Sequence, residues 1–220
     1  FAHNSQTDAV ETVFAEKSST ALGVLGRIRD TLAAKGHAVG SYSVSGNTRS
    51  LVGDGSRSPP PDIIDATNGV IPFDYKDRVP ELTKYLDELL ANNRSSSFLA
   101  DTWLTSAHTA IKRSTSLGEI LDGVSLATEF STEANIGKQF MRAAQVIGAR
   151  SVLGNKRDLI YVSIGGFDTH NNAKETVATK FAEIDLALGD FVAEMQAQGV
   201  WDRVTVLQSS EFGRTMNSNG

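Results

Sequence analysis

Apolar residues recur at every third or fourth position through most of the chain, which is the spacing of amphipathic helices. The pattern predicts helices over residues 5–14, 22–32, 79–90, 97–113, 136–150 and 177–195, and it is ambiguous over 117–130. Ser5 and Asp8 have capping-box spacing, so we expect the first helix to start at Ser5. Gly36, Gly154 and Gly199 follow the periodic runs and are typical of helix ends.

Runs of apolar and β-branched residues predict strands over residues 159–164 and 203–208, on either side of the helix at 177–195. A strand, a helix and a second strand make a βαβ unit, so we expect both strands to be parallel and central in a sheet. A weaker pattern predicts a strand over residues 38–44. The fold class expected is α/β, as a single domain over residues 1–220. An irregular loop excursion with a short edge strand is expected at about 45–75.

Composition narrows the function. The chain has 220 residues, of which 40% are hydrophobic and 21% charged, as in an ordinary globular domain. The net charge of -5 offers no basic face for nucleic acid, and no apolar run approaches the roughly 20 residues of a membrane span. Because the chain has no Cys, any metal ligands must be His, Asp or Glu, and there are only four His.

Two polar motifs follow the two predicted strands, at the edge of the sheet where parallel strands bind ligands. The first contains Asp168 and His170, and the second contains Glu211 and Arg214. Residues two apart in an extended chain project to the same side, so Asp168 and His170 have the spacing of a pair that chelates a divalent ion. The alternative is that Asp168 or Thr169 caps the following helix and that His170 lies on its first turn.

The second motif allows two interpretations as well. Glu211 is a candidate metal ligand and Arg214 a candidate clamp for a bound anion, or the two form a structural ion pair. Ser209 and Ser210 stand where a hydroxyl nucleophile could stand, although no nucleophile elbow marks them. His3, at a helix start, is a further catalytic candidate, and ordinary helix capping is its alternative.

The sequence resembles domain-of-unknown-function family 1501, which is grouped with alkaline-phosphatase-like and sulfatase-like proteins. The resemblance is carried by two motifs in tandem, Ile164-Gly-Gly-Phe-Asp-Thr-His170 and Ser210-Glu-Phe-Gly-Arg-Thr215, and by the helix at 137–150. It recurs more weakly at His3-Asn-Ser-Gln6 and Gly23-Val-Leu-Gly-Arg27.

The resemblance implies an alkaline-phosphatase-like parallel sheet flanked by helices and a site that hydrolyses phosphate or sulfate esters. Asp168 and His170 would be ligands of a divalent ion such as zinc, calcium, magnesium or manganese, and Glu211 a ligand or the partner of one. Arg214 would contact the substrate's anion, and His3 would lie near the nucleophile loop. The family also implies a small anionic ester as substrate and a secreted or periplasmic location.

The sequence departs from the family pattern in three places. Family members carry a Gly-Gly-Asn-Asp-like strand before the position of Phe1 and a Gly-Thr-Asp-His-Gly motif after Gly220, so we expect the central fragment of a larger domain. Ala2 stands where the family usually has Ser. Two hypotheses therefore stay open: a metal-dependent ester hydrolase, and a non-catalytic structural or binding component of a secreted or multi-protein assembly.

Overall fold

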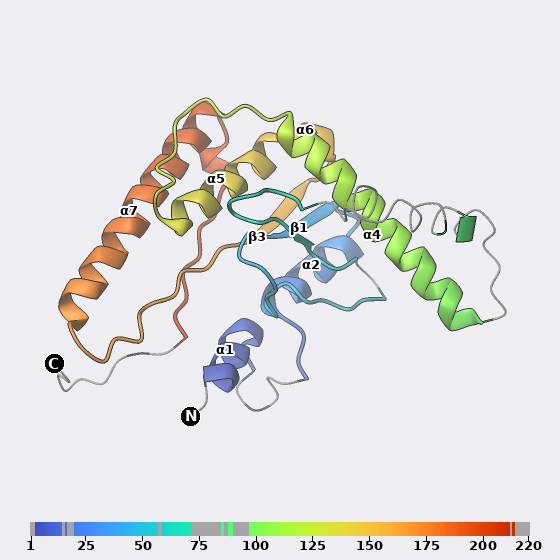
Figure 1. Cartoon of the computed structure of the whole chain (residues 1–220), viewed down its shortest axis with the longest axis horizontal. Coiled ribbons are helices and arrows are strands. Elements are labelled where there is room, and N and C mark those ends of the chain that lie inside the picture. The colour runs from blue at the N-terminus through green and yellow to red at the C-terminus, as the bar shows by residue number, and fades with distance from the viewer. Residues whose placement is uncertain are drawn as a thin grey trace. The chain divides into compact units, whose positions relative to one another are not determined.

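The chain divides into two units, which we describe separately. The sheet unit comprises residues 1–67 and 124–220, and the α4 unit comprises residues 68–123. A computed structural model (Figure 1) describes residues 3–14, 16, 20–56, 59–71, 85, 88–89, 97–211 and 213.

The described part of the sheet unit contains a three-stranded parallel sheet with strand order β2-β1-β3. Its strands are β1 (Val39–Ser43), β2 (Asp62–Ile63) and β3 (Arg157–Tyr161). Tyr42 on β1 pairs in register with Ile160 on β3, so both side chains project to the same face. The α/β class, the strand at 38–44 and the short edge strand within 45–75 are thereby confirmed.

Helices α5 (Asn135–Gly148) and α7 (Ala173–Ala197) lie side by side in Figure 1 and supply most of the residues of one buried apolar cluster. The rings of Phe140 on α5 and Phe191 on α7 lie 5.1 Å apart. Ile160 of β3 packs against this cluster together with Val162 and Ile164. The three occupy alternate positions of the chain, which face the same side where the backbone is extended. The short helix α6 (Arg150–Leu153) follows α5.

Helices α1 (His3–Thr12) and α2 (Val24–Ala34) precede the sheet in the chain. Helix α2 ends at Ala34, and Gly36 follows the helix end as predicted, with a φ of 82° that suits a glycine. The predicted start of α1 is wrong: the helix already includes His3, so Ser5 lies inside it and does not cap it. The described helix thus begins two residues nearer the N-terminus than the hydroxyl-to-acid spacing indicated.

The second predicted strand, at 203–208, is not formed. Trp201–Arg203 is a 3₁₀ turn, η1, and residues 204–210 belong to no strand, with Leu207 86% exposed. Val204 has the extended backbone that β-branched residues favour, but a strand also needs a hydrogen-bonding neighbour. The Gln139 side chain accepts from Ser163 N and donates to Ser163 O, both at 2.8 Å, so a helix side chain serves the backbone beyond β3. β3 is therefore an edge strand of the described sheet and not a central one.

Helix α4 (Phe98–Asp122) belongs to the α4 unit. It contains the predicted helix at 97–113 and extends through the first part of the ambiguous stretch. Gly118 lies on the side of α4 next to Val70, and Ser114 Oγ lies 3.5 Å from Ile71 O. The predicted helix at 79–90 lies largely outside the described residues. In the part of the chain that the structure describes, no helix is both long enough and apolar enough to cross a membrane.

Candidate functional site

The segment between β3 and α7 carries Asp168 and His170 in a loop. Helix α7 begins at Ala173, and its N-cap is Asn172 in the left-handed conformation. Asp168 therefore does not cap α7, and His170 lies before its first turn, which removes the capping alternative. Gly166, with a φ of 92°, turns the chain ahead of Asp168.

Two carboxylates and two imidazoles come together at this loop. We call His3, Asp168, His170 and Glu211 the His3 cluster. His3 Nδ1 lies 2.8 Å from Glu211 Oε1, and His3 Nε2 lies 3.4 Å from Asp168 Oδ2. His170 Nδ1 lies 3.8 Å from Asp168 Oδ1 on the other side of that carboxylate. The His3 ring therefore connects the two motifs, because it contacts Asp168 of the first and Glu211 of the second.

Three separate parts of the chain deliver these side chains. His3 comes from the first turn of α1, Asp168 and His170 from the loop after β3, and Glu211 from the segment after residues 204–210. Residues 204–210 lead the chain to Glu211 even though they form no strand. Sheet pairing of the second segment is thus not needed for the convergence.

Electrostatics favour a protonated His3. The hydrogen bond that His3 donates to Glu211 and the charge of that carboxylate raise the pKa of His3 above its ordinary value, and Asp168 adds to this effect. The side chains of His3, Asp168, His170 and Glu211 are 60%, 38%, 76% and 32% exposed. The cluster is therefore a surface network in contact with water.

The donor set suits a divalent cation, because carboxylate oxygens and imidazole nitrogens are ligands of zinc and manganese in proteins. Among the described residues, however, no three His, Asp or Glu side chains are gathered tightly enough to hold one ion. The assignment of Asp168, His170 and Glu211 as metal ligands remains a prediction. Ser210 is exposed beside Glu211, and Arg214 lies outside the described residues.

Sequence reasoning missed two carboxylates with many partners. Glu11 on α1 accepts hydrogen bonds from Thr48 Oγ1 (2.8 Å), the Arg49 amide (2.7 Å), the Ser50 amide (3.2 Å) and the Tyr161 hydroxyl (3.1 Å). No local pattern could have shown this, because all of its partners are distant in the sequence.

Glu194 on α7 is the second missed carboxylate, and its residue is 1% exposed. It accepts from the amides of Ala127 and Thr128 at 3.2 and 2.7 Å, and from Thr128 Oγ1 and Gln198 Nε2 at 2.7 and 2.9 Å. Burial alone would raise the pKa of Glu194, but the hydrogen bonds from Gln198 and Thr128 and from the two amides outweigh it and lower the pKa. Glu194 thus holds the loop before α5 to α7.

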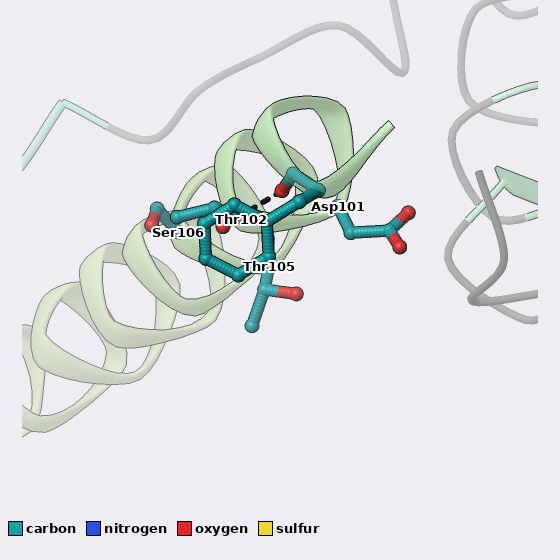
Figure 2. Close-up of a pocket in the computed structure, with 5 residues that line it drawn as sticks. Asp101, Thr102, Thr105 and Ser106 are labelled. Atoms are coloured by element: carbon teal, nitrogen blue, oxygen red, sulfur yellow. Dashed lines mark hydrogen bonds between the residues drawn. The ribbon is translucent and has the colours of Figure 1, made fainter. Parts of the chain in front are cut away.

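A hollow of about 310 Å³ lies on helix α4, within the α4 unit. Figure 2 shows its lining side chains following one another along a single helix, with the Thr102 hydroxyl donating to Phe98 O at 2.9 Å. The lining residues are Phe98, Asp101, Thr102, Thr105 and Ser106. None of the predicted site residues is among them.

A protein-family model described as "Protein of unknown function (DUF1501)" matches the chain over residues 50–220. The chain belongs to this family. The matched range of the DUF1501 chain includes Asp168, His170 and Glu211, whereas His3 lies before it. No curated protein and no solved structure matches the chain.

Proposed function

We propose that this DUF1501 chain carries part of a site for metal-dependent hydrolysis of small phosphate or sulfate esters. The observation that supports it is the convergence of Asp168 and Glu211 on the two ring nitrogens of His3, with His170 on the other side of Asp168. An alkaline-phosphatase-like arrangement of the complete domain belongs to the same proposal.

In this proposal Asp168, His170 and Glu211 hold the ion, which supplies positive charge for the ester oxygens and acidifies a bound water. Exposed side chains change rotamer on the nanosecond scale, so the donor set can close around an ion. Arg214, four positions after Ser210, contacts the non-bridging oxygens. The choice of ester follows from these charges, because phosphate and sulfate esters present the same anionic oxygens.

His3 serves as the proton donor. During hydrolysis, the oxygen of water or of a hydroxyl such as that of Ser210 bonds to phosphorus or sulfur, and the bond to the alcohol oxygen breaks. His3 gives its proton to that departing oxygen. In the protein without metal, the carboxylates of Glu211 and Asp168 raise the pKa of His3 above its ordinary value, which favours the protonated ring that this role requires.

Metal binding and turnover test the proposal together. We expect the full-length protein to bind Zn²⁺ or Mn²⁺ in calorimetry and to hydrolyse an aryl phosphate or an aryl sulfate. Asp168→Ala and His170→Ala should each weaken binding by at least the roughly 10-fold to 100-fold that loss of a side chain supporting a ligand costs. Asp185→Ala, on the exposed side of α7, is the matched control. Unchanged metal content and activity in both site variants would overturn the proposal.

A non-catalytic role is the second candidate, as a binding or structural component of a secreted or multi-protein assembly. It is supported by the exposure of the His3 cluster, since exposed ion pairs are common on surfaces that do no chemistry. Turnover of either aryl ester by the purified protein, lost in Asp168→Ala, would exclude this candidate. The secreted or periplasmic location stays a prediction, and export of a tagged full-length protein would test it.

A further inference from the structure

Helix α1 is attached to the sheet unit mainly by polar contacts. Thr12 is its only buried residue among those described, and no α1 residue belongs to the apolar core. Besides Glu11 and His3, two further α1 residues make polar contacts with α2 and with the loop after β1. The Thr12 carbonyl accepts from Arg27 Nη2 at 2.5 Å, and Asp8 Oδ1 lies 3.8 Å from Arg49 Nη1. The place of α1 therefore depends on hydrogen bonds more than on apolar packing.

The Glu11 carboxylate has the most partners of these attachments. Oε1 takes the Thr48 and Tyr161 hydroxyls, and Oε2 takes two successive backbone amides of the loop after β1. One side chain thus joins α1 to that loop and to the last residue of β3. Four hydrogen-bond donors occupy the two carboxylate oxygens of Glu11, so these oxygens are not left to take a proton or to bind a metal ion. Any effect of Glu11 on the His3 cluster is therefore indirect.

Helix α1 and the segment 161–168 are in contact at both ends of the helix. Glu11 lies eight residues after His3, which is about 12 Å along a helix. Tyr161 precedes Asp168 by seven residues, so α1 contacts the segment 161–168 twice: Glu11 with Tyr161, and His3 with Asp168. A rigid helix fixed at Glu11 fixes the place of its first turn.

We infer that Glu11 is a positioning residue, which holds α1 against Tyr161 and the loop after β1 so that the His3 ring reaches Asp168 and Glu211. The inference rests on the proposed function in that His3 has a catalytic role only there. The geometric claim itself concerns the protein alone, without metal or substrate.

The test uses the whole chain with isotope-labelled histidine and no added metal or ester. The His3 ring signal is assigned by its loss in His3→Gln, and amide exchange is measured across α1, α5 and α7. In Glu11→Ala we expect α1 amides to exchange about tenfold faster relative to those of α5, because a charged hydrogen-bond acceptor is lost. The His3 ring signal should move toward that of a free histidine at the same pH.

Glu194→Gln is the matched control, since it disturbs another carboxylate with four partners in the same unit but one that does not touch α1. It should leave the His3 signal and the relative exchange of α1 unchanged. Tyr161→Phe removes a single hydrogen bond to Glu11 and should give a smaller shift in the same direction; it decides the matter if Glu11→Ala does not fold.

An unchanged His3 signal and unchanged α1 exchange in a folded Glu11→Ala or, failing that, Tyr161→Phe protein would overturn the inference. An equal shift in Glu194→Gln would overturn it too, because the effect would then be general loosening. Since neither metal nor ester is present, failure of the hydrolase proposal leaves this result standing, and failure here leaves the hydrolase test standing.

Discussion

His3 Nδ1 lies 2.8 Å from Glu211 Oε1, although 208 positions separate the two residues in the chain. The imidazole is the point at which the helix α1, the loop after β3 and the last described segment meet. Because Asp168 approaches the second ring nitrogen, both nitrogens face carboxylate oxygens. That arrangement favours the doubly protonated ring.

The first prediction concerns this contact. The pKa of His3 should lie above 6.5 in the protein without metal, and Glu211→Gln should lower it, since Glu211 is the largest cause of the rise. A histidine ring titration by NMR measures both values. Glu183→Gln is the control, because Glu183 pairs with Lys180 on α7 and should leave the titration of His3 unchanged. A midpoint for His3 that is the same in Glu211→Gln would contradict the contact.

The second prediction concerns Glu194. Glu194→Gln should lower the free energy of unfolding at pH 7 by about 2 kcal/mol, because hydrogen bonds to a buried charge are lost. The folded-state pKa of Glu194 is below the unfolded value of 4.5, so its stabilisation is present above that value and is lost as the pH falls through the folded pKa. Urea unfolding at pH 7 and in acid measures the two differences.

The difference between wild type and Glu194→Gln should therefore shrink in acid. Glu175→Gln, at an exposed position in the first turn of α7, is the control and should change stability little at either pH. Equal stability of Glu194→Gln and wild type at pH 7 would count against the role given to Glu194.

The third prediction concerns the close contact between α2 and the loop at 49–53. A Cβ at Gly26 would lie 2.2 Å from Val52 O, and the Gly26 amide donates to Ser50 O at 3.0 Å. Gly26→Ala should therefore destabilise the protein by about 1–3 kcal/mol. Gly189→Ala is the matched control: it lies within α7 with open space around its Cβ, so it should stabilise by up to about 1 kcal/mol. Thermal unfolding checks whether Gly26→Ala lowers the stability and Gly189→Ala does not.

The fourth prediction concerns Asp158, whose pKa is raised above 3.8 by burial, with Asn155 opposing the rise through a 2.9 Å hydrogen bond. A raised carboxyl pKa in the folded state means that stability falls as the pH rises from 3.8 through the folded value. Asp158→Asn should therefore raise the melting temperature at pH 7 and lose this advantage near pH 2. A lower melting temperature for Asp158→Asn than for wild type at pH 7 would contradict this prediction, because the charged carboxylate would then stabilise the folded protein. Asp185→Asn is the exposed control.

Local signals predicted the parts of the fold that depend on local physics. Gly36 and Gly199 both adopt positive φ at the ends of α2 and α7, as their places after periodic runs indicated. The strand at 203–208 failed because strand formation depends on a neighbour. Its residues favour an extended backbone, but residues 204–210 pair with no strand, and β3 lies at the edge of the described sheet.

The candidate site also has one part that the sequence could predict and one part that it could not. Asp168 and Glu211 could be placed near one another because each follows an apolar run of strand length. Their contact with His3 could not be derived, because α1 is held by Glu11 through partners up to 150 positions away. A carboxylate that bonds to distant amides leaves no periodicity or spacing in the sequence.

The 208-residue separation between His3 and Glu211 has a consequence for biosynthesis. A nascent chain can form α1, bind Glu11 to the loop after β1 and later join it to β3 while translation is still under way, since domains tend to fold from the N-terminus during synthesis. The complete cluster cannot exist until Glu211 has left the ribosome. Every shorter translation product therefore has a His3 ring without its strongest partner.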